Sequence, residues 1–210
     1  MAIAASGAVS LSDFRSEFVG GSSAISLGDL YRGGSNIRAK AGNNTATNLA
    51  ANVPTSGAID FADFYSQAKG FRKTYSSGAT NQDASAVFGD DYSVDYPKEI
   101  VIDSGVELGA TSTSQEALQI DSGLSGSMTI TNNGTLSGAG GAANGGAGGD
   151  AFEANVSCTL INNGTIRAGG GGAVKVAGVA RAARAVREVT ARQFTVRLVP
   201  KYKLLAPTLL

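Results

Sequence analysis

Two stretches of the chain, TITNNGTLSGAGG beginning at Thr129 and TLINNGTIRAGGG beginning at Thr159, nearly repeat each other thirty residues apart. In each, residues of alternating polarity lead into Asn-Asn-Gly, a second short alternating run follows, and glycines come next. Such alternation is typical of half-buried β-strands, and Asn-Gly is typical of the turn between them. A near-repeat of this length therefore predicts stacked copies of one supersecondary unit.

The repeat predicts a mainly β fold, with a short glycine-rich β-solenoid or a prism of stacked hairpins. Asn and Gly are expected in the turns because they tolerate positive φ. Rungs built from small apolar residues enclose little volume, so we expect further rungs or partner chains, and most simply a homotrimer. The expected inward stack consists of Ile130, Leu136, Leu160 and Ile166, with Val101, Val106, Leu118 and Ile120 in the preceding rungs.

The glycine run GAGGAANGGAGG, residues 138–149, admits two structural interpretations. It is either a free linker or a packed polyglycine helix with three residues per turn, in which neighbouring backbones bond directly because no Cβ separates them. A phosphate-binding loop is not indicated, because no Gly-Lys-Ser/Thr follows the glycines.

Packed glycine helices of this kind resemble those of the receptor-binding adhesins at the tips of some phage long tail fibres. The resemblance lies in the glycine-rich composition and not in aligned residues. It implies that loops beside the glycine helices contact molecules of the host surface. Loops on a rigid repeat scaffold are suited to binding, because they can change without disturbing the stack. The candidate receptor-contacting residues are Gly140, Gly141, Asn144, Gly145, Gly146, Gly148, Gly149, Gly170 and Gly171.

Three copies of a second motif occupy the N-terminal part of the chain: SGAVSLSDF from Ser6, SSAISLGDLY from Ser22 and SGAIDFADFY from Ser56. We expect each copy to form a brief strand that runs into a short helical turn, within a small α+β module. The copies serve either as hydrophobic staples of that module or as docking motifs for a neighbouring tail protein. The candidate docking residues are Phe14, Leu30, Tyr31, Phe64 and Tyr65.

The N-caps of these helical turns would be Ser10, Ser26 and Asp60, residue types that accept hydrogen bonds from the first free N–H groups of a helix. The repeated acids Asp13, Asp29 and Asp63 have no partner at a fixed spacing. We therefore interpret these acids as caps or solvated surface and not as catalytic groups.

The phrases VPTSGAIDFADFYSQAKG and SSAISLGDLYRGG resemble segments of minor tail and tail-fibre proteins of tailed bacteriophages. The resemblance covers roughly residues 1–75 and supplies no catalytic residues. It implies a place in the virion, at the tail tip, and partners among the other tail proteins, such as a hub or a fibre.

The composition argues against most enzyme classes. The chain has 29 glycines, no histidine and a single cysteine, so the commonest general base and the commonest transition-metal ligand are missing. We expect no cofactor and no metal, and Cys158 fits a small buried apolar residue. A polysaccharide-cleaving tailspike is the enzymatic alternative, with its acids in the dense cluster Asp90, Asp91, Asp95 and Glu99.

The N-terminus carries neither a basic leader nor a long apolar segment, and no run approaches the roughly 18 apolar residues of a membrane helix. We therefore expect synthesis in the cytoplasm of the bacterial host and no membrane insertion. The predicted function is structural and recognition-related, in a phage tail tip or fibre that adsorbs to the host. A bacterial surface adhesin or another glycine-rich structural protein is the main alternative.

The C-terminal part differs sharply in charge from the rest. It holds eight Lys/Arg and one Glu after Gly172, against nine Lys/Arg and sixteen Asp/Glu before. It has no nucleic-acid-binding motif, and its composition favours a disordered or weakly helical tail. The predicted divisions are an N-terminal repeat module (1–75), a connector (76–98), a glycine-rich β-repeat domain (99–172) and a basic tail (173–210).

The composition of the tail suggests that it is read out of frame. When residues 179–189, VARAARAVREV, are written with codons ending in G and each codon is begun one base earlier, they become Gly-Gly-Ala repeated. This repeat would continue the run of glycines at residues 169–172. We therefore hypothesise that the segment after about Gly172 is a shifted version of a longer glycine-rich domain.

Overall fold

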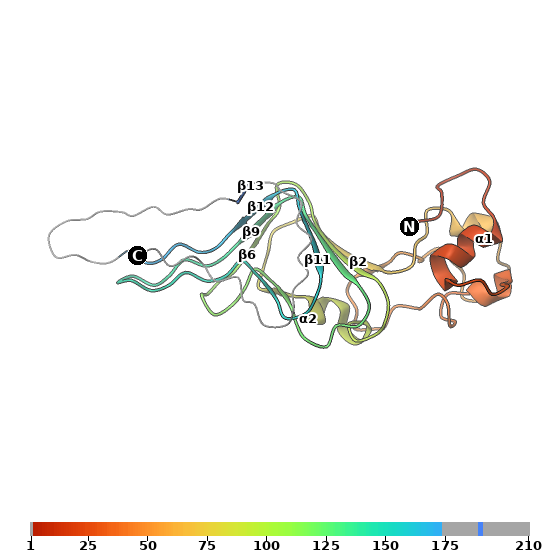
Figure 1. The fold of residues 1–210 in the computed structure, drawn as a ribbon, viewed down its shortest axis with the longest axis horizontal. Helices are drawn as coiled ribbons and strands as arrows, with labels where there is room; N and C mark the ends of the chain where they lie inside the picture. Colours follow the sequence, from red (N-terminus) through yellow and green to blue (C-terminus); the bar gives the residue numbers. More distant parts are fainter. Residues whose placement is uncertain (1, 174–188, 191–210) are drawn as a thin grey trace.

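Three stacks of parallel strands form a β-solenoid of about three turns (Figure 1). The structure, a computed structural model, describes residues 2–173 and 189–190. The first stack is β2 (Phe71–Tyr75), β5 (Lys98–Ile102), β8 (Met128–Asn132) and β11 (Thr159–Asn162). The second is β3 (Ala79–Thr80), β6 (Glu107–Gly109), β9 (Thr135–Ser137) and β12 (Thr165–Arg167), and the third is β4 (Gln82–Asp83), β7 (Leu118–Ile120) and β10 (Phe152–Ala154).

Two short antiparallel strands complete the sheets. β1 (Thr47–Asn48) pairs with β2, and β13 (Val189–Thr190) pairs with β12. The first turn of the solenoid begins with Phe71, in the stretch that the sequence analysis gave to the end of the N-terminal module and to the connector. The proposed basic tail lies outside the described residues from residue 174 onward, except for β13.

The thirty-residue repeat sets the register of the stack. Ile100 lies opposite Ile130, which lies opposite Leu160, and all three side chains are buried. Of the expected inward residues, all but two are fully buried, and Ile166 is partly buried against the core. The mainly β solenoid is therefore confirmed.

Val101 was wrongly expected to point inward. In β5 the buried positions alternate from Lys98 through Ile100 to Ile102, which leaves Val101 on the outer face. Successive side chains of a strand point to opposite faces, so a run of three apolar residues cannot all face the core. Because Lys98 is polar but buried, the sequence did not show which residues of β5 alternate toward the core.

The Asn-Asn-Gly turns are explained by close approach and not by positive φ. Neither Gly134 nor Gly164 has a positive φ. A Cβ added at Gly134 would lie 2.2 Å from the carbonyl oxygen of Val106, and one at Gly164 would lie 2.1 Å from the oxygen of Gly134. Glycine is needed here because the backbone of the preceding rung passes too close for any side chain.

The first asparagine of each turn forms a buried ladder. Asn132 donates from Nδ2 to Oδ1 of Asn162 at 2.7 Å and to the carbonyl of Thr165 at 3.2 Å. Its own Oδ1 accepts from the N–H of Gly134 at 3.1 Å. A buried amide is stable only when its polar atoms are bonded, and this ladder satisfies them from one rung to the next.

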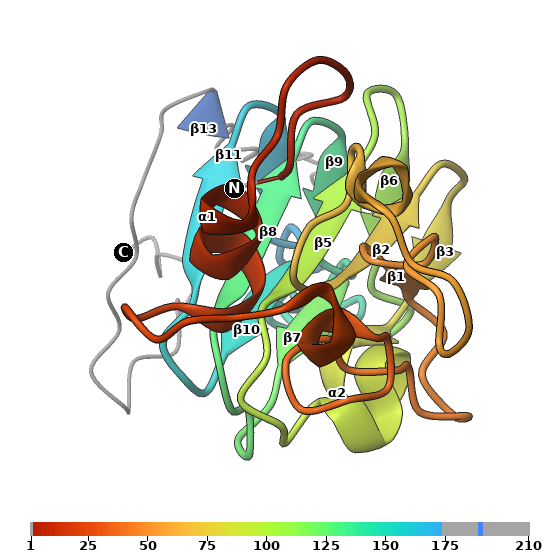
Figure 2. The same cartoon turned by 90° about the vertical axis from the view of Figure 1, so that its right-hand side faces the viewer.

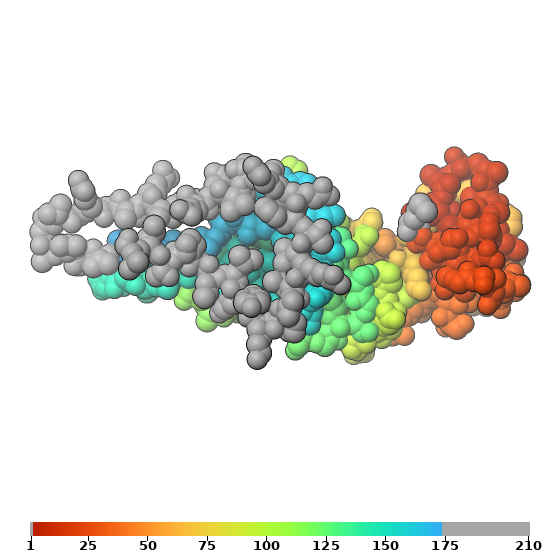
Figure 3. All heavy atoms as spheres, in the orientation of Figure 1, coloured from red at the N-terminus to blue at the C-terminus, as the bar shows by residue number. Residues whose placement is uncertain are grey.

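The N-terminal module lies at one end of the molecule, as Figure 3 shows, and it faces the viewer in Figure 2. Its helical turns are α1 (Leu11–Phe14), continued by a π-helical turn (Arg15–Val19), and two 3₁₀ turns, Leu27–Leu30 and Phe61–Phe64. Each of the three repeats begins with a capping box, in which the acid bonds back to the cap residue three positions earlier. The helical part of the expectation holds, whereas the cap residues are extended and the residues before them belong to no strand.

The repeats supply the core of this module. Phe14 stacks on Phe64 with ring centroids 4.3 Å apart, and Phe18 lies against Phe64 at 5.8 Å. Phe14, Leu30 and Phe64 are completely buried at equivalent positions of the three copies. The staple interpretation of the repeats therefore describes their structural role.

A buried carboxylate joins the loop after the second repeat to the solenoid. Asp91, in a 3₁₀ turn (Gly89–Asp91) that follows α2 (Ala84–Phe88), accepts from Arg38 Nε at 2.5 Å, from the Ala41 N–H at 2.7 Å and from Asn44 Nδ2 at 3.0 Å. Burial raises the pKa of Asp91, but these hydrogen bonds and the Arg38 charge outweigh it and hold the pKa below its ordinary value.

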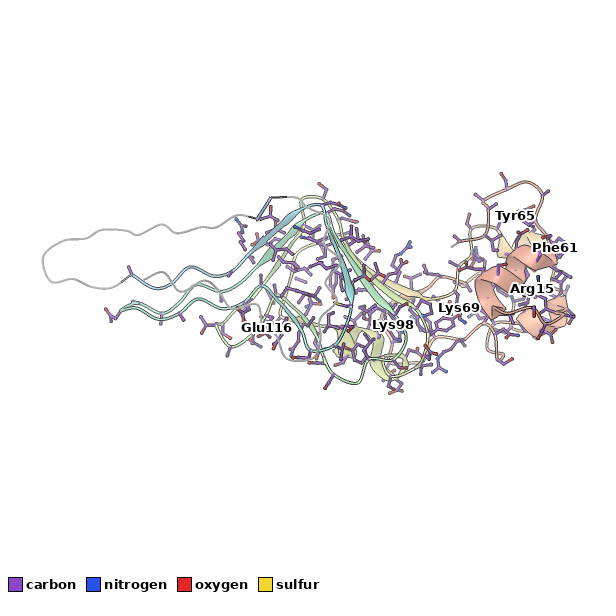
Figure 4. All side chains as sticks on the ribbon, viewed as in Figure 1. Arg15, Phe61, Tyr65, Lys69, Lys98 and Glu116 are labelled. Carbon is purple, nitrogen blue, oxygen red and sulfur yellow. The ribbon has the colours of Figure 1, made fainter. Side chains whose placement is uncertain are left out.

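The buried Lys98 is fully bonded inside the solenoid (Figure 4). Its Nζ donates to the carbonyls of Val94, Tyr96 and Ser125 at 2.8, 2.9 and 2.8 Å. Burial lowers its pKa to about 8. The lysine thus joins the carbonyls of Val94 and Tyr96 to that of Ser125 in the next turn of the solenoid.

Candidate functional site

The glycine-rich residues leave the solenoid after β9 and β12 and extend away from the N-terminal module (Figure 1). They form three segments, residues 138–144, 146–149 and 167–173, which we call the glycine bundle. Apart from Arg167, the last residue of β12, these residues belong to no strand or α-helix. Their order comes from hydrogen bonds between the segments.

Hydrogen bonds between the first and third segments recur every three residues. The N–H of Gly138 donates to Arg167, that of Gly141 to Gly170, and that of Asn144 to Ala173, at 2.9, 2.8 and 2.9 Å. The pairing advances by three residues on both segments and in the same direction. This is the period of a polyglycine or polyproline II helix, which turns once in three residues and has no internal hydrogen bonds.

The middle segment runs antiparallel to the other two with the same period. The N–H groups of Gly149 and Gly146 donate to the carbonyls of Ala139 and Ala142 in the first segment, at 2.8 and 3.0 Å. In the third segment, Gly169 and Gly172 donate to Gly149 and Gly146, at 2.8 and 2.7 Å. All three segments are therefore bonded to one another, and the packed interpretation of the glycines holds.

Several of these glycines are required because a Cβ would strike the backbone of the next segment. An added Cβ would lie 1.7 Å from the Ala139 oxygen at Gly169 and 1.7 Å from the Ala142 oxygen at Gly172. At Gly138 and Gly141 the nearest backbone atoms would be 2.1 and 2.0 Å away. The blocked positions on each of these segments are three residues apart, as the helical period requires.

The tip of the bundle is a turn at Ala143, Asn144 and Gly145, and all three residues are exposed. Asn144 has φ 72° and Gly145 has φ 89°, so this turn does use the left-handed conformation that Asn and Gly tolerate. The described part of the bundle carries one charged residue, Arg167 at its base, which lies 3.5 Å from Glu107. The tip is thus a small, uncharged loop on a bonded scaffold.

The comparison with protein families decides the identity of the chain. The family model described as phage tail fibre adhesin Gp38 matches residues 71–189. This range begins with the first strand of the solenoid and covers more than half of the 210 residues.

The chain belongs to the phage tail fibre adhesin Gp38 family.

Membership of the Gp38 family confirms the expected tail-fibre class and a place in the phage tail. Searches of curated proteins and of solved structures found no significant match. The Gp38 match covers the solenoid and the glycine bundle, and it leaves out the N-terminal module, so the family supports the adhesin half of the molecule.

The glycine bundle and the turn at its tip contain all of the candidate receptor-contacting residues of this Gp38-family adhesin, but they fall into two groups. Gly140, Asn144, Gly145, Gly170 and Gly171 are exposed and available to a partner. The remaining four hold the bundle together through backbone contacts, and they are Gly141, Gly146, Gly148 and Gly149. The sequence analysis missed the exposed Ala142, Ala143 and Ala147, which lie at or beside the tip.

The candidate docking residues of the N-terminal module also fall into two groups, one buried and one half-buried. Phe14, Leu30 and Phe64 are buried and cannot touch a partner directly. The half-buried Tyr31 and Tyr65 donate their hydroxyls to the carbonyls of Gly57 and Gly7, which ties the first residues of the third and first repeats to the module.

A partner could instead reach the apolar residues just outside that core. Phe61 is 38% exposed and packs edge-on against Phe14, with ring centroids 5.1 Å apart. Figure 4 shows Phe61 on the module, far from the solenoid. We call the following half-buried or exposed residues of the three repeats the module apolar surface: Val9, Leu11, Ile25, Leu27, Ile59 and Phe61.

Two groups of acidic residues have structural roles in the described part of the chain. Asp91 is wholly buried and bonded to three groups, so a substrate cannot reach it. A second pair, Asp83 and Asp121, lies between α2 and β7, where burial and a hydrogen bond with Asp83 raise the pKa of Asp121. Both carboxylates bond to Ser85, so they anchor α2 to the solenoid.

Within residues 2–173 and 189–190, no three His, Cys, Asp or Glu side chains gather as they would around a metal ion. Cys158 is buried, and burial raises the pKa of its thiol to about 11, in keeping with the expected apolar role. No helix in the described part of the chain is long and apolar enough to cross a membrane.

Proposed function

We propose that this adhesin binds a host-surface receptor with the tip of its glycine bundle and attaches to a neighbouring tail protein with its N-terminal module. The observation that carries the receptor proposal is the exposed Ala143–Asn144–Gly145 turn on a scaffold with hydrogen bonds at every third residue. A loop on a rigid scaffold loses little entropy on binding, which favours recognition.

The arrangement of the two ends supports a division of labour. Figure 1 shows α1 and the glycine bundle at opposite ends of a long molecule. A component that joins a tail to a cell needs two such separated contact surfaces. The module apolar surface supports attachment to another tail protein, a hub or a fibre, because exposed apolar residues at one end favour contact with a partner.

Competition for the host tests the receptor proposal. Purified adhesin added to host cells before the phage should reduce adsorption in proportion to its concentration. The test uses the whole chain, so no fragment has to fold on its own. Undiminished adsorption at saturating adhesin would refute the proposal that this chain supplies the receptor contact.

Substitution on the module apolar surface tests attachment. Phe61→Asp should reduce the amount of adhesin in purified virions, whereas Thr74→Asp, an exposed residue of β2, should leave it unchanged. The matched pair controls for the added charge, and circular dichroism checks that both variants fold. Equal incorporation of the two variants would show that attachment uses another surface.

The oligomeric state and the site of synthesis are proposals as well. The interior of the solenoid is filled by the chain's own side chains, so a homotrimer is not needed for burial and is supported only by analogy with other fibres. Light scattering of the purified protein should give the trimer mass if that expectation is right. We further propose synthesis in the cytoplasm of the bacterial host, followed by assembly into the tail.

We propose that the protein is not an enzyme, in keeping with an adhesin family. The engagement of Asp91 in structural hydrogen bonds supports this proposal against the tailspike alternative. The family match likewise favours a tail-fibre function over a bacterial surface adhesin. Turnover of a capsular polysaccharide by the purified protein would refute the non-enzymatic proposal.

A further inference from the structure

The corner between the second and third stacks of strands carries a longer loop in each successive turn of the solenoid. It is Asn81 alone in the first turn, residues 110–117 in the second, and residues 138–151, which include two segments of the glycine bundle, in the third. We call residues 110–117, ATSTSQEA, the corner loop. Figure 4 labels Glu116 of this loop near the root of the bundle, where the bundle leaves the solenoid.

Backbone hydrogen bonds join both ends of the corner loop to the root of the bundle. The N–H of Ala110 donates to the carbonyl of Ser137, the residue before the first glycine segment, at 2.8 Å. The N–H groups of Ala117 and Leu118 donate to the carbonyl of Ala151, two residues after the middle segment, at 3.1 and 3.2 Å. The corner loop is therefore stacked in register against the root.

The middle of the corner loop lies against Gly149, where the three glycine segments meet. Gly149 is buried, and its N–H donates to Ala139 while its carbonyl accepts from Gly169. A Cβ at Gly149 would lie 2.8 Å from the Cα of Thr113 and 3.3 Å from the carbonyl oxygen of Ser112. The backbone of the loop thus fills the space beside Gly149, so the bundle cannot tilt in that direction.

Asn81 holds the corner loop from the first turn. Its Nδ2 donates to the hydroxyl of Thr111 at 2.6 Å, and its Oδ1 accepts from the N–H of Thr111 at 2.8 Å. Within the loop, the hydroxyls of Thr111 and Ser112 donate to Oε1 of Gln115 at 3.1 and 3.2 Å. A continuous chain of contacts therefore runs from the first turn through the loop to the root of the bundle.

This chain of contacts adds little to burial, because Asn81 is half-buried and Thr111 is exposed. Its effect is on direction. The first segment, residues 138–144, places the tip roughly 22 Å from the root at about 3.1 Å per residue. A tilt of about 10° at the root would move the tip by about 4 Å, which is more than a hydrogen bond tolerates.

We propose that Asn81 and the corner loop are positioning elements, which fix the direction in which the glycine bundle leaves the solenoid and thereby aim its tip at the receptor. The second half of this statement rests on the proposed function of the tip. The first half concerns the adhesin alone and holds for any receptor.

The distance between the tip and the solenoid tests the positioning directly. Spin labels attached through Ala143→Cys and Ala86→Cys report the distance from the tip to α2 in the full chain. The buried thiol of Cys158, whose pKa burial raises to about 11, does not compete for the label. Asn81→Gly removes the side chain but keeps a residue that tolerates the φ of 50° at this corner. Its distance distribution should broaden by about 4 Å, the displacement that a tilt of about 10° produces.

Asn163→Gly is the matched control for this measurement. Asn163 also bonds to the neighbouring turn, with its Nδ2 donating to Oδ1 of Asn133 at 3.0 Å, but it lies at the corner before the second stack. Its distribution should keep the wild-type width. Equal widths in Asn81→Gly and Asn163→Gly would overturn the proposal.

Two further readouts separate positioning from simple stabilisation of the bundle. Hydrogen exchange of the peptide covering residues 138–149 should be unchanged in Asn81→Gly, because the bonds between the glycine segments remain. Faster exchange alongside the broader distribution would overturn the positioning role. Asn81→Asp keeps an oxygen that accepts from the N–H of Thr111, so it should restore the wild-type width. A width as large as that of Asn81→Gly would overturn the proposal.

Competition for the host distinguishes this proposal from the proposed function. About ten-fold more Asn81→Gly adhesin than wild-type adhesin should be needed to halve phage adsorption, which corresponds to about one lost hydrogen bond at the receptor. A broader distribution with undiminished competition would support the positioning but refute receptor binding by the tip. An unchanged distribution would overturn the positioning, independently of the adsorption result.

Discussion

Gly169→Ala should open the glycine bundle while the solenoid stays folded. The new Cβ would lie 1.7 Å from the carbonyl oxygen of Ala139, whereas Cβ contacts below 3.0 Å are essentially never observed. The segments must therefore separate by more than an ångström at this point. Gly170→Ala is the matched control, because a Cβ there meets nothing within 4 Å and its φ is not positive.

The size of the effect follows from the hydrogen bonds at the point of contact. Separation breaks the bond from Gly169 to Gly149 and the bond from Gly149 to Ala139, both 2.8 Å long, and weakens the neighbouring one at Gly172. At about 1 kcal/mol of net stabilisation each, the loss is about 2–3 kcal/mol of local stability. Since 1.4 kcal/mol is a factor of ten, amide exchange should accelerate roughly 50-fold.

Hydrogen exchange of the peptide covering residues 138–149 measures this change. It should accelerate in Gly169→Ala and remain at the wild-type rate in Gly170→Ala. The melting temperature should change little in either variant, because neither glycine contacts the solenoid core. If both variants exchange at the same rate, the bonded bundle is refuted and the glycines act as a free linker.

Three further substitutions test the solenoid. Lys98→Met should lower the free energy of unfolding by about 2–4 kcal/mol, since it removes the donor of three hydrogen bonds to backbone carbonyls. Because the pKa of Lys98 is lowered to about 8, the folded state holds fewer protons than the unfolded state above that pH. Wild-type stability should therefore rise relative to Lys98→Met between about pH 8 and pH 10, as chemical denaturation would show. Asn132→Ala should cost about 2–3 kcal/mol in the same assay, and Asn133→Ala, on the outer face, under about 1 kcal/mol; similar losses would discount the buried ladder. Asp91 has a lowered pKa, so its stabilisation is complete above the ordinary value of 3.8 and is lost as the pH falls below it. Asp91→Asn should therefore show a weaker acid dependence of unfolding than the control Asp90→Asn, and equal dependence would contradict the assigned hydrogen bonds.

The repeats were the part of the fold that the sequence predicted well. The thirty-residue spacing of the Asn-Asn-Gly units translated into strand register, because identical units stack most simply in register. The capping boxes were also readable, since Ser10, Ser26 and Asp60 stand three residues before an acid. Both signals involve residues close together in the sequence, and both recur along the chain.

Features that depend on long-range contacts were not readable in the same way. The burial of Lys98 depends on carbonyls contributed in part by Ser125, which is 27 residues away. Because a polar residue occupies an inward position of β5, the alternation was misread and Val101 was wrongly assigned to the inner face. Three docking candidates were found to be buried for a related reason: sequence shows that Phe14 is apolar, but only packing shows whether it faces the core or the surface.

The candidate receptor site was found by composition and refined by geometry. The sequence drew attention to the glycine run, but it could not separate glycines that hold the bundle together from residues that reach solvent. The distinction rests on the position of an added Cβ, which at the blocked glycines would lie about 2 Å from a backbone atom of the neighbouring segment. It also identified Ala143 at the tip, which composition alone gave no reason to choose.

Adsorption of phage that carry a single tip substitution tests the account most directly. Ala143→Glu places a charge on the exposed turn without a blocked Cβ position, and Ala86→Glu makes the same change on the exposed side of α2. Both variants should assemble normally into virions. The account predicts that Ala143→Glu phage lose most adsorption to the host while Ala86→Glu phage adsorb like the wild type. Normal adsorption of Ala143→Glu phage would contradict the claim that the tip of the glycine bundle contacts the receptor.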